Sequence, residues 1–225
     1  MTNSGVESAP LAGIRRLIRE PFCGLSHLVG AALSIVALIV MLLLADGRPW
    51  HVVSFSIYGA SLILLYSASG FAHSLHCSPH TAARLDRYDY AAIFLLIAGT
   101  YTPVCLISLG GALGWSLLLI EWLLAAVGVA TVLRGHGCSN LLRTCIYLAM
   151  AWLAVGFAPA LVRRMESGAI AWLLVGGAVY SLGAIVFVRA RPTLWPGRFG
   201  SHDLWHCLVL VGSACHFIMM ILYVA

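Results

Sequence analysis

Four polar side chains occur as two pairs, each with the spacing of one helical turn. Ser69 and His73 form the first pair, and His202 and His206 form the second. On a helix, residues four apart project from the same face. Three imidazoles from two helices can therefore hold one zinc ion and leave its fourth position to water, a known catalytic arrangement. A bound zinc can lower the pKa of such a water to about 7, which makes hydroxide available at neutral pH.

The composition of the chain that carries these pairs indicates a membrane protein. Hydrophobic residues make up 61% of the 225 residues, charged residues 9%, and the mean hydropathy is +0.96. About 20 apolar residues span a bilayer as a helix, and seven such runs fit the chain. We predict an all-α integral membrane protein, a seven-transmembrane helix bundle over 25–225 preceded by an N-terminal segment, 1–24. The predicted spans are 25–45, 53–76, 88–108, 112–133, 142–162, 169–188 and 204–224.

The arginines predict the orientation of the bundle. With the N-terminus in the cytoplasm, ten of the 13 basic residues lie on that side, and Arg48, Arg163 and Arg164 lie on the other. Cytoplasmic loops collect Arg, so we predict a cytoplasmic N-terminus and an external C-terminus. Because topology accounts for the net charge of +5, no nucleic-acid partner is expected.

This orientation brings the two pairs to one level of the membrane. Ser69 and His73 end the second predicted span, Asp89 begins the third, and the two histidines of the second pair begin the seventh. Ionisable residues in a span indicate function, because burying them without a role is unfavourable. We predict that His73, His202 and His206 bind zinc near the cytoplasmic side. Asp89 and Ser69 would then act on the zinc-bound water or on a substrate oxygen.

Three stretches carry a resemblance to a known family. "SASGFAHSLH", "DYAAIFLLIAGTYTP" and "SHDLWHCLVLVGSACHF" resemble the hemolysin III branch of the progestin and adipoQ receptor family. The resemblance implies a multi-pass protein of the bacterial cell membrane with a zinc ion on the cytoplasmic side. It implies the same ligands, His73, His202 and His206, with Ser69 and Asp89 at the zinc-bound water. The likeness extends to membrane hydrolases that include alkaline ceramidases. Cys23 departs from the family, which usually has Asn there.

Several other polar residues leave alternatives open. Glu20 and His27 could brace the site, although a surface role is favoured for Glu20. His216 lies about 15 Å along the helix from His206, too far for the same ion, and either forms a hydrogen bond or packs. Glu121 is either a proton or ion handle or a neutral acid hydrogen-bonded to a neighbouring helix. Asp203 is expected to be an acidic residue of the first helical turn that the helix dipole stabilises, after a cap at Ser201.

Three classes of function fit these features. The first is a zinc-dependent hydrolase that cleaves an amide or ester of a membrane lipid or fatty-acyl substrate held in the bundle, in membrane homeostasis. The second is a channel or pore, which the absence of a polar stripe through several helices disfavours. The third is a sensor of the membrane state in which zinc has a purely structural role.

Overall fold

The computed structural model describes residues 17–135 and 139–225. Seven helical segments in this part are long and apolar enough to cross a membrane, which confirms the predicted seven-helix fold. Most of the predicted N-terminal segment 1–24 lies outside the described residues. The helices are α2 (Pro21–Ala45), α3 (Pro49–Ser74), α4 (Pro79–Pro103) with η1 (Val104–Leu109), α5 (Gly111–Leu133), α6 (Asn140–Ala151), η2 (Leu153–Phe157), α7 (Ala158–Arg164), α8 (Ser167–Arg189), and α9 (Ser201–Met219) with η3 (Met220–Val224).

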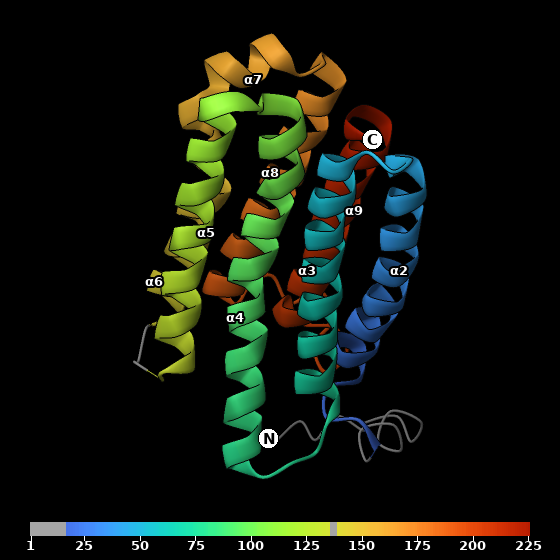
Figure 1. The fold of residues 1–225 in the computed structure, drawn as a ribbon. Helices are drawn as coiled ribbons and strands as arrows, with labels where there is room; N and C mark the ends of the chain where they lie inside the picture. Colours follow the sequence, from blue (N-terminus) through green and yellow to red (C-terminus); the bar gives the residue numbers. More distant parts are fainter. Residues whose placement is uncertain (1–16, 136–138) are drawn as a thin grey trace, which may run out of the picture.

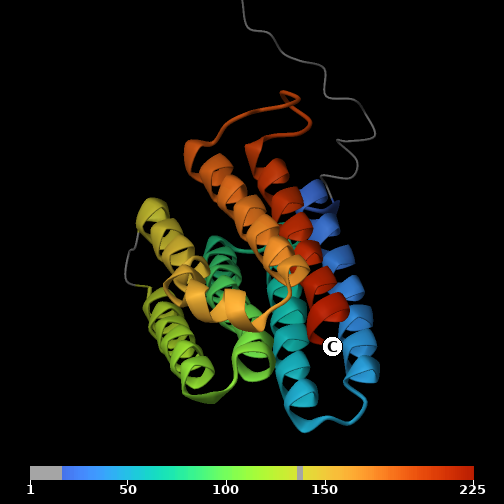
Figure 2. The same ribbon diagram turned by 90° about the horizontal axis from the view of Figure 1, so that it is seen from above.

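The long helices run side by side and form one bundle (Figure 1). Seen along the bundle, α9 lies between α2 and α8, and α3 lies between α2 and α4 (Figure 2). The end of α3 and the start of α9 therefore meet at the same end of the bundle, together with the start of α2. This arrangement brings together residues that are more than 100 positions apart in the chain.

The third span is longer than predicted. The helix begins at Pro79, not near residue 88, because Ser78 caps it: the Ser78 hydroxyl accepts a hydrogen bond from the Thr81 N–H at 3.3 Å. Proline at the first helical position suits such a start. Asp89 consequently lies within the third turn of α4 and not at its first residues, and the polar turns before it extend the helix beyond its apolar part.

The fifth span is broken, whereas an unbroken run over 142–162 was predicted. The α-helix ends at Ala151, continues as the short turn η2, and resumes as α7, which crosses the end of the bundle (Figure 2). The Tyr101 hydroxyl donates to the carbonyls of Met150 and Ala151 (3.1 and 2.9 Å) and accepts from the Ala154 N–H (2.9 Å). Backbone groups inside a bilayer need such internal partners, so one tyrosine of α4 makes the break possible.

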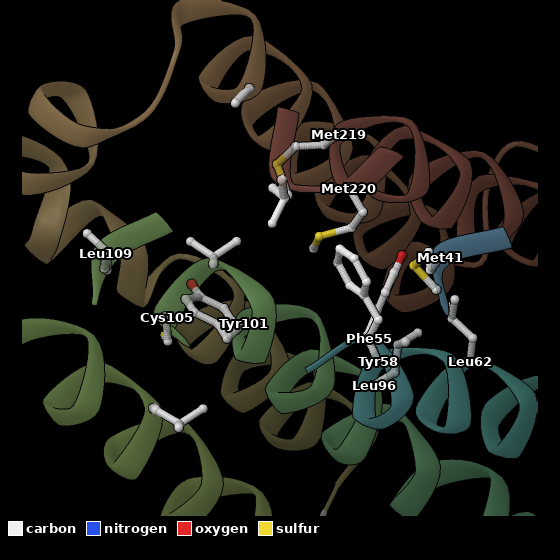
Figure 3. Close-up of a cluster of buried hydrophobic side chains, with 14 of the residues drawn as sticks. Met41, Phe55, Tyr58, Leu62, Leu96, Tyr101, Cys105, Leu109, Met219 and Met220 are labelled. Carbon is white, nitrogen blue, oxygen red and sulfur yellow. The ribbon is translucent and has the colours of Figure 1, made fainter. Parts of the chain in front are cut away.

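An apolar core fills the other end of the bundle. Side chains of α2, α3, α4 and η3 converge there, among them Met41, Phe55, Tyr58 and Met220, all fully buried (Figure 3). Many leucines and valines point outward on the remaining helix faces, as expected for surfaces that contact lipid. The core thus holds the helices in register while the polar residues gather at the opposite end.

Candidate metal centre

Backbone contacts fix the start of α2 against the end of α3. The Glu20 N–H donates to the His73 carbonyl at 2.9 Å, and the Arg19 N–H donates to the Ser74 carbonyl at 3.2 Å. The two helices approach so closely that a side chain on Gly24 would collide with Ser74. The glycine in "EPFCGLSH" therefore allows the carboxyl group of Glu20 to reach the end of α3.

Three imidazoles meet where α3 and α9 come together. The ring centroid of His73 lies 5.1 Å from that of His202 and 4.7 Å from that of His206. The Nε2 atoms of His202 and His206 are 3.2 Å apart. The structure thus brings together all three histidines that the sequence assigned to one site.

His73 lies between two carboxyl groups from two other helices. Its Nδ1 is 2.9 Å from Glu20 Oε2, and its Nε2 is 3.8 Å from Asp89 Oδ2. The hydrogen bond to His73 lowers the pKa of the Glu20 carboxyl, and the charge of Arg19, at 3.2 Å, adds to this effect. Glu20 is therefore a hydrogen-bond partner of His73. The sequence had favoured a surface role for it.

A second layer of polar contacts surrounds His206 and the start of α9. His27 of α2 is buried, and its Nε2 lies 2.9 Å from His206 Nδ1. The Cys23 thiol donates to Asp203 Oδ1 at 3.2 Å, while Asp203 Oδ2 accepts from the Gly200 N–H at 2.8 Å. The cap of α9 is thus Gly200, and the predicted cap at Ser201 is wrong. The Asp203 carboxylate therefore caps the first turn of α9 with one oxygen and accepts the Cys23 hydrogen bond with the other.

Atoms that could bind a metal ion are close together in two overlapping sets. Cys23, His202 and His206 form one, and Glu20, His73 and His202 form the other; within each set the candidate ligand atoms lie within 4.8 Å of one another. Nitrogen, sulfur and carboxylate oxygen are all ligands of divalent transition metals. The cluster can therefore hold a metal ion, and His202 belongs to both sets.

A cavity of about 320 Å³ opens from this cluster into the bundle. Ser69 and Asp89 line it beside the histidines, and its remaining wall is mostly apolar. Ser69 is almost fully buried. The two residues predicted to act on water or substrate therefore face the same cavity as the cluster.

One wall of the cavity is formed by α6. Arg143 lines it, is largely buried, and stacks its guanidinium group 3.6 Å from the centre of the Tyr90 ring. A smaller cavity of about 170 Å³ between α6 and α8 shares Thr144, Leu148 and Ala184 with the large one. The space inside the bundle thus extends to the gap between these two helices.

Sequence reasoning missed or undervalued four residues of this region, three of them at the start of α2. Glu20, Cys23 and His27 follow one another at intervals of three and four, so they share one face of α2. That spacing was a usable signal. Arg143 gave no comparable signal, because the predicted cytoplasmic location was sufficient to explain its charge. Only the fold brings it to the cavity.

Glu121 lies outside this site. It is fully buried on α5, and neither carboxyl oxygen has a hydrogen-bond partner within residues 17–135 and 139–225. Of the two alternatives that the sequence left open for Glu121, the part of the chain that the structure describes does not show the hydrogen bond to a neighbouring helix.

The comparisons with known proteins agree with this architecture. A family model described as Haemolysin-III related matches residues 15–217. The chain belongs to this family. It is 40% identical to Hemolysin-3 of Bacillus cereus over 202 residues, 89% of each chain. It is 37% identical to a Hemolysin-3 homolog of Bacillus subtilis (strain 168), over 88% of this chain and 91% of that one.

A more distant relative links the chain to a wider group. The adiponectin receptor protein of Drosophila melanogaster is 26% identical over 72% of this chain and 41% of its own length. The predicted membership in the progestin and adipoQ receptor family, hemolysin III branch, is confirmed. Residues 15–217, which the family model matches, contain all three histidines of the cluster.

Proposed function

We propose that the protein is a zinc-dependent hydrolase that cleaves an amide or ester bond of a membrane lipid. One observation carries the proposal: a cluster of three histidines lies at the polar end of a largely apolar cavity of about 320 Å³. Pockets that combine apolar walls with a few convergent polar groups are typical of ligand sites.

The spacing of one pair of histidine nitrogens fits zinc. Two nitrogens bound to one tetrahedral zinc at 2.0–2.1 Å lie about 3.3 Å apart. The Nε2 atoms of His202 and His206 are 3.2 Å apart. His73 would supply the third nitrogen from α3; in the structure it groups with His202 and Glu20, whereas His206 groups with His202 and Cys23. Zinc bound there would act as a Lewis acid and lower the pKa of a coordinated water to about 7.

The other residues of the site then have distinct tasks. The Asp89 carboxylate accepts the proton of the attacking water, because it faces the cavity on the side of His73. The Ser69 hydroxyl donates to the substrate carbonyl oxygen, and Glu20 keeps the His73 ring oriented by accepting from Nδ1. The Arg143 guanidinium, in the wall that α6 forms, binds the polar head of the lipid.

The cavity also supports a route for the lipid. It shares three lining residues with the smaller cavity between α6 and α8, whose other lining residues include the exposed apolar Leu141, Ile185 and Val188. A lipid can enter there without crossing the polar end of the bundle. The arginine distribution supports placing this end on the cytoplasmic side of a bacterial cell membrane.

A panel of amide- and ester-linked lipids tests the proposal. We expect the zinc-loaded, detergent-purified protein to release fatty acid from at least one of them. Asp89→Asn should lower this rate about 100-fold or more, since general base catalysis contributes that much. His80→Ala, which removes an exposed histidine of α4, should not change it. Zinc-loaded protein that cleaves no lipid would favour the structural role of the metal.

A further inference from the structure

A second polar group lies deep in the bundle, between α3, α8 and α9. The Tyr66 hydroxyl donates to Ser213 Oγ at 2.6 Å, and the Tyr180 hydroxyl lies 2.7 Å from the same oxygen. The Tyr180 ring stacks on His216, with ring centroids 5.4 Å apart. His216 is ten residues beyond His206, which places it about 15 Å further along α9.

The backbone fixes which nitrogen of His216 carries its proton. Nδ1 lies 2.8 Å from the Gly212 carbonyl oxygen, which can only accept a hydrogen bond. Nδ1 therefore donates, and Nε2 of the neutral ring is an acceptor. Nε2 has no hydrogen-bond partner in the described parts of the chain, 17–135 and 139–225. The ring borders the cavity, in space that any side chain on Gly176 would fill.

Tyr180 supplies a donor beside this acceptor. Because Tyr66 donates to Ser213, the Ser213 hydroxyl is free to donate to the Tyr180 oxygen. The Tyr180 O–H then has its own proton available. Tyr180 lines the same cavity as His216. A donor and an acceptor thus lie together in a wall that is otherwise mostly apolar.

We infer that His216 and Tyr180 form a binding subsite for a hydroxyl group on the chain of the lipid ligand. A hydroxyl both donates and accepts, so it satisfies Nε2 of His216 and the Tyr180 O–H at once. A plain hydrocarbon chain would leave both unpaired, at a cost. The inference rests on the proposed function, since the cleavable group would lie at the histidine cluster and the hydroxyl further along the chain.

Calorimetric titration of the zinc-loaded, detergent-purified protein tests this subsite. The probes are palmitic acid and a series of hydroxypalmitic acids with the hydroxyl at successive carbons. We expect a narrow range of hydroxyl positions to bind about fivefold more tightly than palmitic acid, the gain of one typical hydrogen bond. His216→Leu and Tyr180→Phe should each remove this preference and leave the affinity for palmitic acid unchanged.

The outcomes separate the subsite from the hydrolase. If no hydroxyl isomer binds more tightly than palmitic acid, or if the preference persists in both variants, the subsite is refuted. Because two variants test the same preference, the misfolding of one does not leave the subsite untested. Thermal unfolding of each variant would detect such misfolding. A protein that prefers a hydroxyl isomer but cleaves no lipid would refute the hydrolase and support the subsite.

Discussion

At the residue scale, Cys23 decides whether a zinc ion bound as proposed would keep an open coordination position. Its sulfur belongs to a possible ligand set with His202 and His206, yet its thiol donates to the Asp203 carboxylate at 3.2 Å. This hydrogen bond engages the thiol proton, and only the thiolate binds metal well. We therefore expect Cys23 to remain a thiol, which leaves a position of the ion for substrate chemistry.

Cobalt substitution measures this directly. The cobalt-loaded protein should lack the near-ultraviolet absorption band of a metal–thiolate bond, and Cys23→Ser should bind cobalt as the parent does. A thiolate band that disappears in Cys23→Ser would show that Cys23 occupies the open position. The hydrolase proposal would then lose its central requirement.

Glu121 is a residue whose removal should stabilise the protein. Its carboxyl group is fully buried without a hydrogen-bond partner in the described structure, and such burial costs about 1–3 kcal/mol. We expect Glu121→Met to raise the free energy of unfolding by an amount in this range, measured by thermal unfolding in detergent. Glu121→Gln keeps a buried polar group of the same shape and should give little gain. A loss of stability in Glu121→Met would mean that the acid binds a proton or ion that the fold needs.

At the scale of the elements, Tyr101 is the residue on which the broken fifth span depends. Tyr101→Phe would leave the carbonyls of Met150 and Ala151 and the Ala154 N–H without their partner. We expect a loss of about 1–3 kcal/mol, seen as earlier thermal unfolding.

Tyr58 provides the matched control for this experiment. It is also a fully buried tyrosine, but its hydroxyl has no hydrogen-bond partner in the described residues. Tyr58→Phe should therefore leave stability unchanged or raise it slightly. Equal losses in the two variants would contradict the role assigned to the Tyr101 hydroxyl.

The sequence predicts elements well where hydrophobicity alone determines them. Seven apolar runs gave seven membrane-length helices, since a bilayer leaves the backbone few alternatives. The break after Ala151 was not predictable, because it depends on a hydroxyl group supplied by a residue about 50 positions earlier. The early start of α4 was missed because its first turns are polar, and only the cap at Ser78 indicates it.

At the scale of the whole molecule, depth in the membrane was the useful predictor of the site. Residues at the ends of α3 and α9 were expected at one level, and the structure brings their side chains into contact. Depth does not specify which face of α2 turns inward, so the contacts of Glu20 and Cys23 could not be deduced in the same way. The cavity and its deep polar group depend on packing between helices, which no run of residues encodes locally.

The metal content of the purified protein tests the central claim most directly. Elemental analysis should find about one zinc per chain in the parent and in His80→Ala, and a loss of zinc in both His73→Ala and His202→Ala. Such a result would mean that α3 and α9 share one ion. A parent protein purified without chelators that contains no zinc, or variants that both retain it, would contradict the account.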